Sequence, residues 1–161
     1  MNTQYAGFMP NDFVNGIGVS VSYWAQGCPH QCPGCHNPET WDFNGGKPLP
    51  ANIIEQLKEA ITANGIQRNF SVLGGEPLAE ENKETVHQII QAIRETFPDI
   101  TICLWTGYTF KELQNMNDPI ISDILSNINA LIDGRYEQDQ RDVSLMMRGS
   151  RNQKIHILNV F

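Results

Sequence analysis

The chain has 161 residues, the size of one domain, and its 40% hydrophobic and 18% charged content is typical of a folded globular protein. A net charge of −7 argues against nucleic acid as a partner, because phosphates need a basic surface. No apolar run approaches the roughly 18 residues of a membrane span. Residues 1–9 also lack the basic and apolar regions of a signal peptide, so we expect a cytoplasmic protein without a membrane partner.

The hydrophobic pattern of the first hundred residues alternates between strands and helices. Period-2 alternation over 16–23 predicts a strand, and the Gly-, Pro- and Cys-rich stretch 24–49 predicts a long loop of the kind that usually has a function. An apolar stripe in 51–64 predicts a helix that ends at a glycine. A short strand at 69–73 and an amphipathic helix at 81–97 follow.

The second part of the chain continues this alternation. Thr109 and Glu112 have the spacing of a capping box that opens a short helix. Asp118-Pro119 begins another helix with a capping side chain and a first-turn proline. Strands are expected at 100–105, 130–133 and 154–159.

Strands that alternate with helices form parallel sheets through right-handed crossovers. Four or five such units are too few to close an eight-stranded barrel. We therefore expect one α/β domain, residues 1–161, built as an open, partial (β/α) barrel with a short parallel sheet. Ligands bind at the C-terminal ends of such strands. The unusual sequences at these ends predict one active site there: the loop 24–49, Gly74–Glu76, Trp105–Tyr108 and Asp133–Tyr136.

Three of the four cysteines, Cys28, Cys32 and Cys35, have the spacing C-x3-C-x2-C. Three thiolates on one loop can hold three corners of a [4Fe–4S] cluster and leave one iron open to a small molecule. Zinc with His30 or His36 as a further ligand, a catalytic thiol, and buried structural cysteines are the alternatives. Structural zinc usually pairs two separated groups of ligands, whereas this sequence has one group.

The cysteine spacing in an α/β chain resembles the signature of radical S-adenosylmethionine (SAM) enzymes. The continuation Cys35–Trp41, CHNPETW, is similar to the activases of glycyl radical enzymes. GGEPL at 74–78 resembles the superfamily's motif for the amino end of SAM. DGRY at 133–136 and RGSRNQ at 148–153 resemble, more narrowly, the anaerobic ribonucleoside-triphosphate reductase activating proteins.

This resemblance, which covers nearly the whole chain, implies a radical SAM barrel and one [4Fe–4S] cluster held by three cysteines: Cys28, Cys32 and Cys35. It also implies a set of residues that bind SAM: Gly34, Cys35, His36, Gly74, Gly75 and Glu76. Many members of the superfamily carry an aromatic residue before the third cysteine, where this chain has Gly34. His36 is a candidate to stack on the adenine in its place.

The activity that the resemblance implies is the activation of anaerobic (class III) ribonucleoside-triphosphate reductase. In that family, SAM binds the open iron through its amino and carboxylate groups, and one electron from a flavodoxin-like donor breaks the sulfonium bond. Methionine leaves, and the 5′-deoxyadenosyl radical that forms in these enzymes takes the Cα hydrogen of one glycine of the reductase. The cofactors carry this chemistry, so no side-chain acid or base is expected to be catalytic.

Other functions stay open on the sequence alone. They are an activase of another glycyl radical enzyme such as pyruvate formate-lyase, a compact radical SAM enzyme acting on a small molecule, and a non-catalytic zinc or iron–sulfur adaptor. Residues 134–161 carry a net charge of +2 and the rest of the chain −9. This C-terminal segment is either a solvated loop or a contact with SAM or the partner. Cys103 is expected in the core, not as a fourth ligand.

Overall fold

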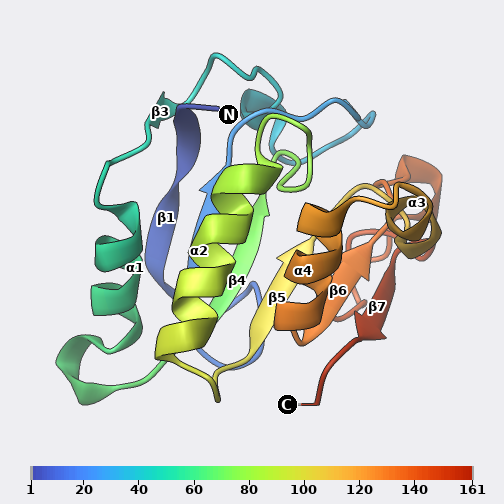
Figure 1. Ribbon diagram of the computed structural model, residues 1–161. Coiled ribbons are helices and arrows are strands. Elements are labelled where there is room, and N and C mark those ends of the chain that lie inside the picture. Colours follow the sequence, from blue (N-terminus) through green and yellow to red (C-terminus); the bar gives the residue numbers. More distant parts are fainter. Residues whose placement is uncertain (1, 161) are drawn as a thin grey trace.

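The computed structural model describes residues 2–160, which form one seven-stranded sheet with helices against it (Figure 1). The strands are β1 (Gln4–Asp12), β2 (Ser20–Ala25), β3 (Lys47–Pro48), β4 (Asn69–Gly74), β5 (Ile102–Trp105), β6 (Ala130–Asp133) and β7 (Lys154–Ile157). The α-helices are α1 (Ile53–Ile61), α2 (Lys83–Thr96), α3 (Phe110–Asn115) and α4 (Pro119–Asn127). Three short 3-10 turns are η1 (Pro38–Thr40), η2 (Ala63–Gly65) and η3 (Gln138–Gln140).

The sheet is mixed, with the strand order β3-β1-β2-β4-β5-β6-β7. The central strands β2, β4, β5 and β6 are parallel, as the alternation of strands and helices predicts. The outer strands β1, β3 and β7 pair antiparallel, so the expected short parallel sheet is present as the centre of a larger, mixed sheet. The C-terminal ends of the four parallel strands point to the same edge of the sheet (Figure 1).

Most predicted elements are present with small shifts at their ends. The predicted strand 16–23 begins only at Ser20, because Gly16 and Gly18 have φ values of +127° and +64° that no extended strand adopts. The capping box of Thr109 and Glu112 opens α3 as predicted. The carboxylate of Asp118 caps α4, with a proline at the first turn. None of the helices formed by residues 2–160 is long and apolar enough to cross a membrane.

The two faces of the sheet differ in what covers them. Helices α1, α2 and α4 pack on one face (Figure 1), where alternate strand residues such as Phe70 and Leu104 are fully buried among isoleucines and leucines. The opposite face carries a smaller buried cluster of Cys103, Ala130 and Ile132. Met147 and Ile155 of the C-terminal segment pack on that cluster. Cys103 is therefore a core residue, as predicted.

Candidate functional site

The cysteine loop, residues 24–49, closes on itself before it reaches α1. The N–H of Gly27 donates to the carbonyl of Thr40 at 2.7 Å, and the N–H of Cys28 to that of Trp41 at 3.1 Å. The side-chain amide of Gln26 donates to the carbonyl of Asp42 at 2.7 Å. These bonds join the entry and the exit of the loop and leave the segment with the three cysteines as its tip.

The three thiols of the loop tip line one cavity of about 180 Å³ at the C-terminal ends of the parallel strands. Cys28 is buried and Cys32 and Cys35 are half-buried, and all are free thiols. Burial raises the pKa of the Cys28 and Cys32 thiols. Among residues 2–160 no group of His, Cys, Asp or Glu side chains has the arrangement that would hold a metal ion. Three cysteine sulfurs around one hollow are nevertheless a donor set that suits an iron–sulfur cluster, which cysteines hold as thiolates.

Cys103 is separate from this cavity. Its side chain lies behind β5 in the small cluster on the helix-free face. Burial there raises the pKa of the Cys103 thiol to about 11. A buried thiol of this kind is inert, as expected for a packing residue.

The turn Gly74–Glu76, which we call the GGE turn, follows β4 and is hydrogen-bonded to the start of the cysteine loop. The N–H of Gly75 donates to Ala25 at 3.1 Å, and that of Glu76 to Gly27 at 2.8 Å. Gly74 and Gly75 line the same cavity as the three thiols. A Cβ on Gly75 would lie 2.5 Å from the carbonyl oxygen of Gly27, so the absence of a side chain lets the two segments touch.

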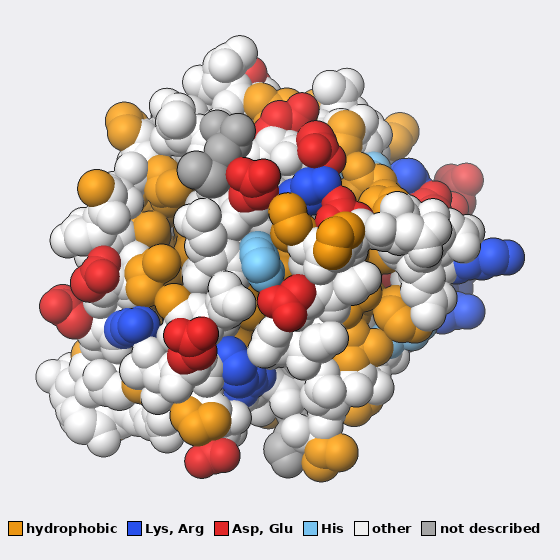
Figure 2. Space-filling view, viewed as in Figure 1, with side chains coloured by type: hydrophobic (Ala, Val, Ile, Leu, Met, Phe, Trp, Pro, Cys, Tyr) orange, Lys and Arg blue, Asp and Glu red, His pale blue; other side chains and the backbone are white. Residues whose placement is uncertain are grey.

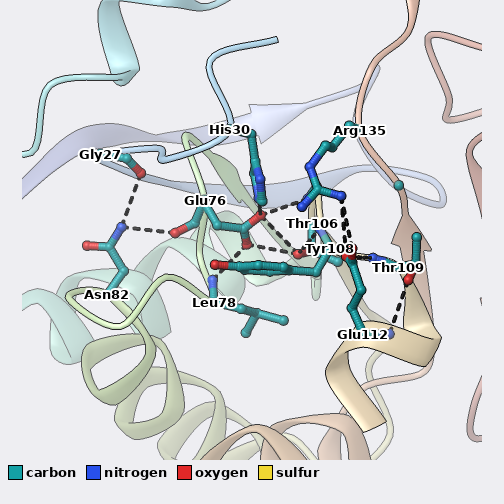
Figure 3. A network of polar contacts seen from close by, with 12 residues as sticks. Gly27, His30, Glu76, Leu78, Asn82, Thr106, Tyr108, Thr109, Glu112 and Arg135 are labelled. Atoms are coloured by element: carbon teal, nitrogen blue, oxygen red, sulfur yellow. Dashed lines mark hydrogen bonds and ion pairs between the residues drawn. The ribbon is translucent and has the colours of Figure 1, made fainter. Parts of the chain in front are cut away.

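Glu76, the last residue of this turn, is fully buried and does not line the cavity. Its carboxylate accepts hydrogen bonds from the N–H of Leu78 at 2.9 Å and from the N–H of Gly107 at 2.7 Å. The hydroxyl of Thr106 donates at 2.9 Å, and His30 Nε2 contacts the same carboxylate at 2.8 Å (Figure 3). The side chain thus connects the cysteine loop with the segment that follows β5.

A second cavity of about 430 Å³ adjoins the first. The residues common to both linings are Cys35, Leu73, Trp105, Tyr136 and Gln153. His36 lines the second cavity, with its ring centroid 5.4 Å from that of Tyr136. Gly34 has a φ of +79°, and a Cβ there would lie 2.0 Å from Oε1 of Gln138. The glycine before Cys35 therefore lets the segment after β6 approach the cysteine loop.

The segments after β5 and β6 complete the first cavity. Trp105, Thr106 and Gly107 line it from one side, and Gly134–Tyr136 from another. Arg135 Nη1 lies 3.2 Å from Oε1 of Glu112, and its guanidinium is 6.0 Å from the ring centre of Tyr108.

Asp133, a sequence candidate, lies at the edge of this site, not in its lining. Its carboxylate accepts hydrogen bonds from the N–H groups of Phe110 and Lys154, at 2.8 and 3.2 Å. Asp133 therefore fixes the start of α3 and of β7.

The sequence analysis missed the lining residue Leu73, and it assigned the lining residue Trp24 to the loop 24–49, whereas the structure has it on β2. Each stands on a parallel strand just before its loop, at a position that faces away from the helices. The signal was available, because side chains alternate between the two faces of a strand. An apolar residue on the helix-free face at the C-terminal end of a strand marks a cavity wall.

The C-terminal segment borders the second cavity from the outside. Arg141 and Ser150 pair as an isolated antiparallel bridge, and the indole N–H of Trp105 donates to the carbonyl of Met147 at 2.8 Å. Basic side chains stand out on the β7 side of the molecule, whereas acidic side chains are scattered over the helix-covered face (Figure 2). The basic residues of this segment that are exposed are Arg135, Arg141, Arg151 and Lys154.

Comparisons with known proteins show the family to which the chain belongs. Residues 14–156 match the family described as a 4Fe-4S single cluster domain. The chain is 37% identical over 155 residues to the anaerobic ribonucleoside-triphosphate reductase-activating protein of Escherichia coli K12, covering 96% of this chain and 98% of that protein. It is 37% identical to the protein of that name from Vibrio cholerae, with 94% and 96% covered. For the one from Enterobacteria phage T4, the identity is 33%, with 94% and 92% covered. The chain therefore belongs to the family of anaerobic ribonucleoside-triphosphate reductase-activating proteins, with a [4Fe–4S] cluster domain.

Proposed function

We propose that this protein is a radical SAM oxidoreductase that activates an anaerobic ribonucleoside-triphosphate reductase by generating a glycyl radical on it. The observation that carries the proposal is one cavity lined by three cysteines and by the two glycines of the GGE turn, in a chain whose curated relatives are named as activators of that reductase. A mixed sheet with helices on one face is compatible with the partial barrel of the radical SAM type.

In this proposal, Cys28, Cys32 and Cys35 hold the [4Fe–4S] cluster. Three protein ligands leave one iron for the amino and carboxylate groups of SAM. When bound, the cluster supplies the electron that cleaves SAM reductively, and a flavodoxin-like protein is the expected donor. The protein's own task is to hold the cluster and SAM in a fixed orientation to each other in a partly enclosed cavity.

SAM is expected to extend from the first cavity into the second. Gly74 and Gly75 offer backbone without side chains to the amino end of the ligand, because both line the cavity of the three thiols. Cys35 lies on the common wall, and His36 lies beyond it next to Tyr136, where an aromatic contact with the adenine is available. Gly34 supports this arrangement by admitting the segment after β6.

The partner in this proposal is the reductase, which presents a glycine, and this protein is expected to act on it in the cytoplasm. Both cavities lie on the helix-free face, and Val14, Leu145 and Met147 from two separate segments line the outer one. These segments also carry exposed apolar side chains. Phe13 and Val14 are 78% and 80% exposed, and Val143 and Met146 are 84% and 70% exposed. Exposed apolar side chains gathered around a cavity are typical of a protein-binding surface.

Electron paramagnetic resonance tests the proposal. The reconstituted protein, SAM and a strong one-electron reductant are mixed anaerobically with purified anaerobic ribonucleoside-triphosphate reductase. We expect a glycyl radical doublet that disappears when any one component is left out. A doublet with pyruvate formate-lyase and none with this reductase would overturn the choice of partner. SAM cleavage without a radical on either protein would favour a small-molecule substrate.

A further inference from the structure

The carboxylate of Glu76 is surrounded by donors from its own chain (Figure 3). Oε1 accepts from the N–H of Gly107 at 2.7 Å and contacts Nε2 of His30 at 2.8 Å. Oε2 accepts from the N–H of Leu78 at 2.9 Å, and the hydroxyl of Thr106 lies within 3.0 Å of both oxygens. A carboxylate has about four acceptor positions, and these contacts use them.

The position of Glu76 agrees with this accounting. Its side chain is 0% exposed and is not part of either cavity wall next to the three thiols. A contact with the ammonium of SAM would require the carboxylate to give up a donor that would then remain buried without a partner. Leaving a buried donor unpaired is unfavourable. The contacts therefore indicate that Glu76 binds groups of its own chain and not SAM.

His30 is the group through which Glu76 reaches the cysteines. It stands between Cys28 and Cys32 in the sequence, and its side chain is 5% exposed. Its ring meets the ring of Tyr108 edge-on, with centroids 4.6 Å apart. A Cβ on Gly107 would lie 2.4 Å from the ring, so the backbone packs directly on the imidazole. The imidazole is therefore packed between Tyr108 and the backbone at Gly107, with its Nε2 directed at the carboxylate of Glu76.

The backbone of Glu76 contributes to the same connection. Its N–H donates to the carbonyl of Gly27 at 2.8 Å, and its carbonyl accepts from the side-chain amide of Asn82 at 3.0 Å. Asn82 also donates to the carbonyl of Gln26 at 3.0 Å. The backbone at residue 76 thus holds the tip at Gly27, just before Cys28, and the side chain holds it at His30, between Cys28 and Cys32.

We propose that Glu76 is a positioning residue that fixes the cysteine loop through His30, and the segment Thr106–Gly107 directly, without contacting SAM. This inference rests on the proposed function in one respect, which is that Cys28 and Cys32 are cluster ligands. It assigns His30 a role as the link between the loop and the buried carboxylate.

A double-mutant cycle on the reconstituted protein tests the link. The variants are Glu76→Gln, His30→Ala and the pair, and the readout is the rate at which iron is lost to a chelator. Each single variant is expected to lose iron about tenfold faster than the parent protein, as for a charge-assisted hydrogen bond. Because the two residues act as one unit, the pair is expected to lose iron no faster than the worse single variant.

Rescue distinguishes positioning from a general loss of packing. His30→Gln keeps an N–H donor toward Glu76 and is expected to restore slow iron release. The matched control is His87→Ala, because His87 makes a similar pair with Asp123, at 2.6 Å, on the helix-covered face. This control is expected to leave iron release unchanged. If Glu76→Gln does not fold, the comparison of His30→Ala with His30→Gln carries the test.

SAM affinity, measured by calorimetry, shows which result would overturn the inference. That result is weaker SAM binding in Glu76→Gln, while iron release stays at the parental rate in both single variants and His30→Ala binds SAM normally. It would make Glu76 a SAM ligand. Neither readout contains the reductase. A failure to activate that partner would therefore leave this inference standing.

Discussion

At the scale of single residues, the chemistry of this protein is divided between two kinds of cysteine. Cys28, Cys32 and Cys35 face a shared cavity, and Cys103 is enclosed by the apolar side chains behind β5. The spacing in the sequence predicted this division, because close cysteines on a loop and a cysteine between apolar strand residues have different surroundings.

Replacing any one of Cys28, Cys32 and Cys35 by Ala is expected to abolish the iron–sulfur absorbance and SAM cleavage, because each is proposed to supply one of the three protein ligands of the cluster. Cys103→Ala is expected to leave both intact. The visible spectrum after anaerobic reconstitution and the yield of 5′-deoxyadenosine measure the effects. Loss of the cluster in Cys103→Ala with retention in Cys28→Ala would contradict the assignment.

A second residue-scale prediction concerns the loop that borders the outer cavity. Burial raises the pKa of Asp12, but hydrogen bonds from Ser22, Asn15 and the backbone N–H of Val14 together lower it by more than burial raises it. The net pKa of Asp12 therefore lies below its usual value. A lowered folded-state pKa contributes stability above the unfolded value, and this contribution is lost as the pH falls through the folded pKa.

Asp12→Asn is therefore expected to reduce the free energy of unfolding by about 1–2 kcal/mol at pH 7. The difference from the parent protein should shrink as the pH falls below about 4, where the unfolded carboxyl is protonated. Urea unfolding of the apoprotein at several pH values measures it. A difference that is independent of pH would show that the charge of Asp12 is irrelevant.

The contacts of Glu76 could not be predicted from the sequence. The motif places it after two glycines, but its partners His30, Thr106 and Gly107 come from two other loops. Only the folded sheet brings those loops to one edge. A glutamate that binds a ligand and one that holds loops together look the same in sequence.

At the scale of elements, local signals predicted most of the fold. The capping residues of α3 and α4 and the ends of β6 agree with the sequence because caps and short apolar runs are local features. Strand β1 escaped prediction because Gly7 and Pro10 interrupt its alternation. The antiparallel direction of β7 also escaped, since periodicity carries no information on strand direction.

The GGE turn gives a prediction about packing. Gly75→Ala is expected to lower the free energy of unfolding by about 1–3 kcal/mol, because the methyl group would meet the carbonyl oxygens of Gly27 and Thr40 at 2.5 and 2.7 Å. Iron retention is expected to fall with stability, since both carbonyls belong to the cysteine loop. Thermal unfolding and iron content measure the two effects.

Gly149→Ala is the matched control for this variant. A Cβ there would first meet ring atoms of Tyr136 at 3.0 Å, which belong to a side chain that can turn. We expect a smaller loss of stability and normal iron content. If Gly75→Ala kept the cluster and lost only SAM affinity, the space beside Gly75 would belong to the ligand and not to the loop.

At the scale of the whole molecule, the helices protect one face of the sheet and the site opens on the other (Figure 1). The sequence predicted that the loops after the parallel strands form one site. It could not predict which parts of the chain cover the helix-free face. Those contacts, such as Trp105 with Met147, join segments without regular structure.

The exposed basic side chains of the C-terminal segment give a prediction about docking. Arg151→Glu is expected to reduce radical yield on the reductase several-fold while uncoupled SAM cleavage stays near the parent value, because Arg151 is exposed and lies two residues after Gly149, which lines the second cavity. Added salt is expected to weaken association, since exposed charges are screened over about 8–10 Å at physiological ionic strength.

Lys58→Glu is the control, because Lys58 lies on α1, on the helix-covered face. It makes the same change of charge and is expected to leave radical yield unchanged. An equal loss of yield in both variants would assign the effect to net charge. An unchanged yield in Arg151→Glu would place the docking surface elsewhere.

The most direct test of the central claim follows one hydrogen atom. The reductase is prepared with glycine that carries deuterium on Cα, and it is mixed anaerobically with the reconstituted protein, SAM and reductant. We predict that 5′-deoxyadenosine gains one deuterium for each radical formed, and that the glycyl doublet collapses because the α-hydrogen that splits it has been replaced. Deuterium-free 5′-deoxyadenosine, or a doublet that persists with the labelled reductase, would contradict the account.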